Sequence, residues 1–198
     1  MKLTLILLML GVSQISVAQK VESVADAQKK DRLKSVERGR SFKVNGEEYQ
    51  HLPKVLAVQK KQSNKTEAQV LADVGSSEKD RIEDKGTFMV YKHGVGRSKA
   101  SISSIASTDT YPTVLNTRTN DIGLLLGTIM VHPNNMADAK GIATSAGVEL
   151  VKSYPHLNLV IYKAKKDADV LDAVAAISAD KRVKDAYPEI LEHVRVPH

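Results

Sequence analysis

The chain has 198 residues, of which 42% are hydrophobic and 26% charged, so it can fold around a core. It has no cysteine, which excludes disulfides, thiolate metal sites and a cysteine nucleophile. The formal charge of +6 comes from 29 Lys and Arg against 23 Asp and Glu, spread along the chain. Nucleic-acid binders concentrate basic residues on one face with interleaved aromatics, so no nucleic-acid partner is expected here.

The N-terminus has the three parts of a secretory signal peptide. Lys2 gives the positive start, residues 3–11 form an apolar run, and Ser16 and Ala18 are small residues suited to a signal-peptidase site. Cleavage after Ala18 predicts signal peptide 1–18 and a periplasmic or secreted protein. The run is too short to span a bilayer comfortably, so no membrane association is expected after cleavage. The alternative is a buried N-terminal strand or helix.

A charged segment and a small β-rich region follow. Residues 19–40 could form a solvated helix or a mobile lead. Residues 41–121, called here the β-rich region, are expected to form a small domain. Asn45-Gly46 predicts a hairpin turn in its first strand pair.

The remaining elements of the β-rich region follow from periodicity and turn signals. We expect a helix at 67–74, a second helix at 77–83, strands at 87–91, 113–117 and 122–131, and a Ser- and Thr-rich loop at 98–110. A turn at 118–121 separates the last two strands.

The C-terminal unit, residues 122–198, has the element order β-α-β-β-α-β. The expected elements are strands at 124–131, 148–154, 157–164 and 183–187, the last broken by Pro188, and helices at 134–146 and 169–177. Asn134 or Asn135 should cap the first helix, and Asp167 or Asp169 the second. This order predicts a ferredoxin-like antiparallel sheet with both helices on one face, and hence an α+β protein. The other sheet face is left uncovered and needs a partner, a second domain or water-tolerant side chains.

Because this fold hosts many functions, its known chemistries can be tested against the sequence. An RNA-recognition domain needs aromatic residues on the central strands, where Tyr162 stands alone. A copper chaperone needs a cysteine pair. An acylphosphatase needs Arg and glycines in the loop after the first strand, which here reads HPNN at 132–135.

No catalytic, cofactor or metal site is expected, and the chain is not predicted to be an enzyme. There is no G-x-S-x-G elbow, and Gly94-Val95-Gly96 lacks the rest of a phosphate-binding motif. The six histidines have no metal-binding spacing; they stand at positions 51, 93, 132, 156, 193 and 198.

Two segments of the C-terminal unit carry a family resemblance. Residues 151–160 read VKSYPHLNLV, and residues 179–189 read ADKRVKDAYPE. They resemble the propeptide, or N-terminal inhibitor domain, of subtilisin-like serine proteases over about residues 124–198. In that family a P-x-L-N/K turn joins the middle strands, and the closing strand resembles A-D-P-x-V-x-x-V-E-P-D. Lys181 replaces the usual proline and Tyr187 the first closing acid, whereas Glu189 keeps the second.

The resemblance implies a folding chaperone and inhibitor of a subtilisin-like serine protease. No protease domain follows His198 in this sequence, so action in trans is expected. The open sheet face would dock on two surface helices of the protease. Glu189 would cap the N-terminus of one helix, and Tyr187 could supply a weaker hydroxyl contact. The alternative for Glu189 is an ordinary solvated acid after a proline turn.

The resemblance also implies that the C-terminal tail enters the substrate cleft of the protease in extended form. The residues concerned are His193, Val194, Arg195, Val196, Pro197 and His198. Register with the family places Arg195 near the primary specificity pocket, and the alternative places His198 there. A frayed terminus without a role is the third possibility.

A different class of function stays open beside the inhibitor. The chain could be a periplasmic structural or adhesion module whose C-terminal unit packs on its own β-rich region. An inhibitor needs its tail extended and free, whereas such a module can bury or lose it. The sequence leaves the role of residues 41–121 open.

Overall fold

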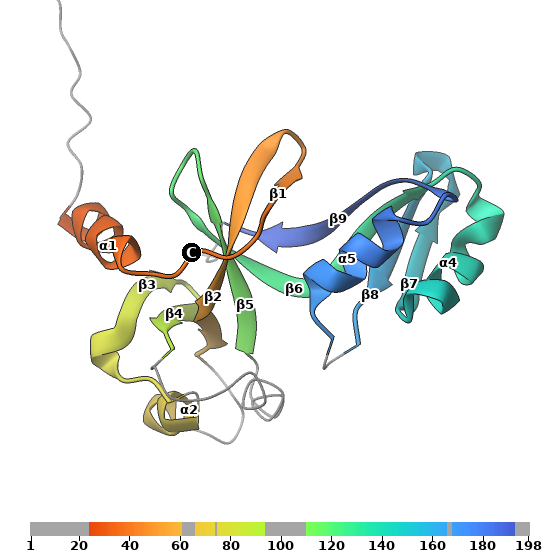
Figure 1. Cartoon of the computed structure of the whole chain (residues 1–198). Coiled ribbons are helices and arrows are strands. Elements are labelled where there is room, and N and C mark those ends of the chain that lie inside the picture. Colours follow the sequence, from red (N-terminus) through yellow and green to blue (C-terminus); the bar gives the residue numbers. More distant parts are fainter. Residues whose placement is uncertain (1–23, 61–65, 74, 94–109, 166–167, 193–198) are drawn as a thin grey trace, which may run out of the picture.

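The structure consists of antiparallel strands and a few short helices (Figure 1). The computed structural model describes residues 24–60, 66–73, 75–93, 110–165 and 168–192. In these stretches nine strands join into one sheet, and every strand pair is antiparallel. The predicted α+β class is therefore confirmed for the described residues.

The β-rich region is organised around its longest strand. Its strands are β1 (Ser41–Val44), β2 (Glu47–Gln59), β3 (Arg81–Lys85), β4 (Phe88–Lys92) and β5 (Thr110–Asn116). β5 lies along one edge of β2, and the other edge pairs first with β1 and then with β4. The register along β5 shifts between Leu52 and Leu56, where Pro53 interrupts the ladder. β3 pairs with β4 and ends this part of the sheet.

The first helix packs on the β-rich region. The sequence left residues 19–40 as either a solvated helix or a mobile lead, and α1 (Val24–Lys34) is helical. Leu33 and Val36 are buried in the core of the β-rich region. Lys29 pairs with Glu83 at 3.1 Å and with Asp121 at 3.2 Å. These contacts tie the charged segment to the sheet.

The local turn predictions hold in part. Asn45 and Gly46 both have positive φ, 50° and 83°, as the predicted hairpin turn between β1 and β2 requires. The predicted helix at 67–74 is confirmed as α2 (Glu67–Asp73). The predicted loop at 98–110 lies outside the described residues except for Thr110, which begins β5.

The second helix predicted for the β-rich region is wrong. Ser77 and Asp80 form a capping box, but it closes only a 3₁₀ turn at Glu78–Asp80 before β3 begins. Residues 81–85 then pair with β4 as a strand, in which Ile82 and Lys85 are buried. A capping signal alone does not distinguish a single turn from a helix, because both satisfy the same backbone N–H groups.

The C-terminal unit follows the predicted order of elements. They are β6 (Ile122–Pro133), α4 (Ala139–Ala146), β7 (Glu149–Tyr154), β8 (Leu159–Lys163), α5 (Val170–Ser178) and β9 (Val183–Leu191). β6 pairs with β8 and β9, and β8 pairs with β7, so the strand order is β9-β6-β8-β7. Both helices lie at the end of the molecule away from α1 (Figure 1).

Both helices of the C-terminal unit cover the same face of its sheet. Ile142 of α4 and Ile177 of α5 are buried in one cluster with Ile129, Val160 and Tyr162 of the strands. Of the predicted caps, Asp169 caps α5, whereas α4 begins only at Ala139 and Asn135 caps the turn before it. The Asn135 side chain accepts from Ala137 N in a 3₁₀ turn before α4, and the Asp169 side chain accepts from Leu171 N at the start of α5.

β6 and β9 continue from the C-terminal unit into the β-rich region. Leu124 of β6 pairs with Thr113 of β5 and with Leu191 of β9, whereas Val131 pairs with Val160 of β8 and Ala186 of β9. β9 therefore runs along one edge of β6, and β5 and β8 follow each other along the other edge.

The predicted end of the last strand at Pro188 is wrong. β9 passes through Pro188 and continues to Leu191. Pro188 lies at a shift in the register between β6 and β9, and β9 pairs with β6 alone. Proline lacks a backbone donor, but at an irregular position of an edge strand no ladder hydrogen bond is lost. Glu189 consequently lies inside the strand and not beyond it.

The buried hydroxyl of Tyr162 gives a test of this core. It donates to Ala139 O at 2.8 Å, which joins β8 to α4. Tyr162→Phe should lower the free energy of unfolding by about 1 kcal/mol in chemical denaturation at pH 7. Tyr154→Phe, at a half-buried position on the other sheet face, is the control and should change it much less.

The same hydroxyl predicts a loss of stability at alkaline pH. Burial raises the pKa of Tyr162 to about 12. A raised pKa means that the folded state favours the protonated hydroxyl. The contribution of Tyr162 to the free energy of unfolding is therefore complete below about pH 10 and is lost between pH 10 and 12. Tyr162→Phe should lack this part of the decline. An identical pH dependence in the two proteins would contradict the assignment.

Candidate functional site

The sheet of the C-terminal unit has a face that the two helices leave uncovered. Met130 of β6 pairs with Ile161 of β8 and with Tyr187 of β9, so these three side chains share that face. All three are half-buried, while their neighbours Ile129, Val131 and Val160 are buried under the helices. We call this surface the open face. These three side chains make it apolar and aromatic, whereas the sequence had also allowed water-tolerant side chains on the uncovered side of the sheet.

The open face extends beyond its centre to the edge strand β7. Val151 and Leu157 are the exposed large hydrophobic residues of the described chain, each 56% exposed. Val151 lies at a bulge in β7, and Leu157 lies in a 3₁₀ turn and not in the strand predicted for 157–164. Lys152 Nζ lies 4.8 Å from the centre of the Tyr154 ring. Lys152 pairs with Ile161 and Tyr154 pairs with Leu159, so the open face reaches β7 with a cation and an aromatic ring at that edge.

His132 is the titratable group beside Tyr187 on this face. Its Nδ1 lies 2.8 Å from Asn158 O, and the two rings are 6.2 Å apart. A carbonyl oxygen only accepts hydrogen bonds, so Nδ1 carries the proton. The neutral ring is thus held in one tautomer, with Nε2 as its acceptor.

The two predicted docking residues of the closing strand lie in different settings. Tyr187 lies on the β9 edge of the open face, opposite Met130. Glu189 is half-buried and stands opposite the bulge of β6, where Gly127 has a φ of 82°. Among the described residues no hydrogen bond or ion pair is found for Glu189. His193 to His198 lie outside the described residues.

The turn before β9 forms without the proline of the protease propeptides. The backbone N–H and guanidinium of Arg182 donate to the Asp180 carboxylate, which lowers the pKa of Asp180 to about 2. The Asn134 side chain donates to Lys181 O at 2.9 Å. Side-chain hydrogen bonds from Arg182 and Asn134 thus hold this turn.

The residue after β9 is held by the β-rich region. Lys85 Nζ, at the end of β3, donates to Glu192 O at 2.7 Å, and Asn116 Nδ2, at the end of β5, donates to Glu192 Oε1 at 3.1 Å. Burial lowers the pKa of Lys85, and the carboxylate of Glu83, 3.8 Å away, opposes this shift. The sequence did not indicate this contact, because residues 77–83 had the pattern of a helix and Lys85-Gly86 that of its end.

Gly123 of β6 makes room for this end of β9. A Cβ at Gly123 would collide with Ile190 Cγ2 and would lie 3.1 Å from Val114 Cγ2. Ile190 packs against the same core cluster as Val114. The chain between Pro188 and Glu192 is therefore closely packed on the β-rich region.

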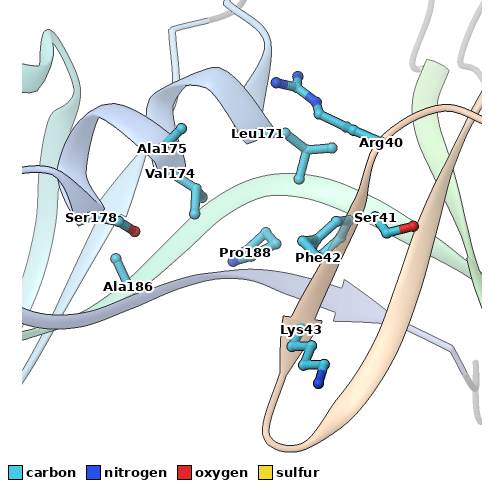
Figure 2. A pocket seen from close by; sticks show the side chains of 10 residues that line it. All are labelled: Arg40, Ser41, Phe42, Lys43, Leu171, Val174, Ala175, Ser178, Ala186 and Pro188. Carbon is cyan, nitrogen blue, oxygen red and sulfur yellow. The ribbon is translucent and has the colours of Figure 1, made fainter.

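A pocket of about 310 Å³ lies between β1, α5 and β9. Figure 2 shows Leu171 and Val174 of α5 above Pro188 of β9, with Phe42 of β1 beside them. At its rim the Arg40 guanidinium binds two carboxylates of α5 and its cap, Asp172 at 2.5 Å and Asp169 at 2.6 Å. The pocket is an apolar seam between β1 and the C-terminal unit.

Two further features of the described residues bear on the function. No group of three or more metal-ligating side chains gathers among them. None of their helices has the length and apolar character needed to cross a membrane.

Comparison with known proteins identifies the family. The family model of the open reading frame 2 N-terminal domain matches residues 19–195, and the chain belongs to that family. No curated protein and no solved structure matches the chain.

The packing at Gly123 gives a prediction. Gly123→Ala should lower the free energy of unfolding by about 1–3 kcal/mol, because the branched side chain of Ile190 cannot turn away within a strand. Gly141→Ala is the matched control. Its Cβ would meet only the far end of the Arg182 side chain, and alanine favours a helix, so thermal unfolding should change little or shift upward. Equal losses in the two variants would contradict the close packing of β9 on β6.

Proposed function

We propose that this member of the open reading frame 2 N-terminal domain family acts in trans as a folding chaperone and inhibitor of a subtilisin-like serine protease. The observation that carries the proposal is the open face, an uncovered apolar surface with Met130 and Ile161 at its centre and Tyr187 of the closing strand beside them. The resemblance of residues 151–160 and 179–189 to protease propeptides supplies the identity of the partner.

The strand arrangement supports a ferredoxin-like C-terminal unit. The order β9-β6-β8-β7, with α4 and α5 on one face, is the arrangement expected for a split β-α-β fold. In protease propeptides of this fold the uncovered face packs on the enzyme. The proposal assigns the same use to the open face of this chain.

A docked sheet would help the protease to fold. The parallel sheet of subtilisin-like proteases requires many contacts between distant residues before any stability is gained, so folding is slow. A preformed apolar face that orders two surface helices would lower this barrier. Glu189 would cap one of those helices at its N-terminus, where backbone N–H groups and the helix dipole favour a carboxylate.

The tail would supply inhibition. Residues 193–198 would enter the substrate cleft as an extended strand, with Arg195 or His198 in the specificity pocket. Export is part of the proposal, because subtilisin-like proteases of this kind act outside the cytoplasm. The signal-peptide pattern of residues 1–18 supports it, and cleavage after Ala18 would leave the residues that the family model matches.

The experiment that tests the proposal refolds a denatured subtilisin-like protease lacking its own propeptide, with and without this chain. The partner of choice is a protease encoded beside it. The proposal requires a higher yield of folded protease and inhibition of the folded enzyme. A chain that neither raises the yield nor binds the protease would favour the structural-module alternative.

Ile161→Lys tests the open face. Ile161 is half-buried at the centre of the face, so a lysine there would place a charge in the docking surface. The affinity for an inactivated protease should fall at least about tenfold, and the refolding yield should fall with it. The chain itself should stay folded, because the lysine head can reach solvent.

The control for Ile161→Lys is Thr144→Lys. Thr144 is exposed on α4, on the helix-covered side of the C-terminal unit. It should leave affinity and yield unchanged. Equal effects of the two variants would show that the open face is not the docking surface.

Deletion of residues 193–198 should separate the two activities. The open face is complete without the tail, so assistance in refolding should persist, whereas inhibition should be lost. If Arg195 fills the specificity pocket, Arg195→Ala should weaken inhibition more than removal of His198, and the order reverses if the terminus fills it. A tail-deleted chain that still inhibits fully would show that the tail does not enter the cleft.

A further inference from the structure

We infer that Lys85 and Asn116 are positioning residues for the C-terminal tail, and that the β-rich region serves to fix the point from which the tail leaves the molecule. The inference rests on the proposed function, because it assigns the tail the inhibitory role. It gives a use to residues 41–121, which the resemblance to propeptides does not cover.

The first observation is a buried ammonium group aimed at the end of β9. The Lys85 side chain is only 7% exposed, and its Nζ donates to Glu192 O at 2.7 Å. Burying a lysine is costly unless its charge is paired and hydrogen-bonded. Its nearest carboxylate, Glu83, also pairs with Lys29 of α1 at 3.1 Å. The backbone carbonyl of Glu192 is thus a closer partner of the buried ammonium than the Glu83 carboxylate, 3.8 Å away.

The second observation is the fixed orientation of the Asn116 amide. Its Oδ1 accepts from Arg118 N at 3.0 Å and from Thr119 N at 3.2 Å, in the turn between β5 and β6. Since the turn holds Oδ1, the NH₂ group must point the other way, where it donates to Glu192 Oε1 at 3.1 Å. The turn therefore preorganises a second contact to the same residue.

The third observation is the packing of the preceding residues. Ile190 fills the space left by the missing Cβ of Gly123, and β9 pairs with β6 through Leu191. Three elements thus hold this end of the chain. β6 pairs with the backbone of β9, β5 binds the Glu192 side chain, and β3 binds the Glu192 carbonyl.

A fixed starting point matters for the reach of residues 193–198. Six residues span roughly 20 Å when extended, so the position of Glu192 limits which part of a docked partner they can reach. Holding Glu192 reduces the directions in which the tail can leave and raises its effective concentration at the cleft. Releasing Glu192 should weaken inhibition without changing how the open face docks.

The test is a double-mutant cycle between each positioning residue and the tail. Lys85→Met and Asn116→Asp are made in the full chain and in the chain that lacks residues 193–198. Inhibition of the active protease and affinity for the inactivated protease are both measured. Asn116→Asp keeps the side-chain oxygen that accepts hydrogen bonds in the turn, so this variant should fold. It tests the inference even if Lys85→Met does not fold. Lys60→Met is the control, since Lys60 pairs with Asp84 at 2.7 Å and makes no described contact with Glu192.

In the full chain, Lys85→Met and Asn116→Asp should raise the inhibition constant about tenfold, the effect of losing one hydrogen bond to a charged group. In the tail-deleted chain they should not alter the affinity for the inactivated protease. Lys60→Met should change neither quantity. Glu192→Gln added to Asn116→Asp should restore inhibition, because the glutamine NH₂ can donate to the new carboxylate.

Three outcomes would overturn the inference. If the Lys85→Met and Asn116→Asp chains inhibit as well as the unaltered chain, inhibition by the tail does not depend on the contacts that hold Glu192. If they weaken affinity equally with and without the tail, their role is structural. In both cases the unaltered chain still inhibits, so the proposed function stands. If the unaltered chain itself does not bind the protease, the proposed function and the inference both fall.

Discussion

The pairing of β6 with its neighbours is the interaction on which the rest of the structure depends. Its first residues complete the β-rich region by pairing with β5, and its last residues carry β8 and the C-terminal unit. β9 pairs with both parts of β6. Any change in this strand therefore acts on both parts of the molecule, and the position of the open face relative to the β-rich region follows from it.

The two faces of the C-terminal sheet lie in different environments: the helices bury one, and the other is uncovered. Ile129, Val160 and Tyr162 are buried by α4 and α5, which gives the unit its stability. Met130, Ile161 and Tyr187 occupy the alternate positions and have no described element above them. Alternation along a strand makes both sets inevitable, because a strand that places every second residue in the core must present the others on the far side. A partner surface is the natural use of a far side that is apolar.

The β-rich region and the tail are connected through charge as well as packing. Lys85 is buried at the end of an edge strand, and its ammonium is satisfied by the carbonyl of Glu192 and the nearby Glu83. α1 contributes Lys29 to the same group of charges. Three parts of the chain therefore meet at this place: the charged N-terminal segment, the β-rich region and the start of the tail.

The sequence by itself determined the elements whose signals are local. Asn45-Gly46 specified a hairpin turn, and Asn135 and Asp169 capped the 3₁₀ turn before α4 and α5. Apolar periodicity placed the four strands of the C-terminal unit and the apolar stripes of its two helices. It thereby predicted the uncovered face and Tyr187 on the closing strand. Only the tertiary structure decided that residues 81–85 form a strand, that β9 continues beyond Pro188, and that Lys85 and Asn116 hold Glu192. The reason is physical: caps and turns are set by neighbours in the chain, whereas an edge-strand proline or a buried lysine is tolerated only because of partners distant in sequence.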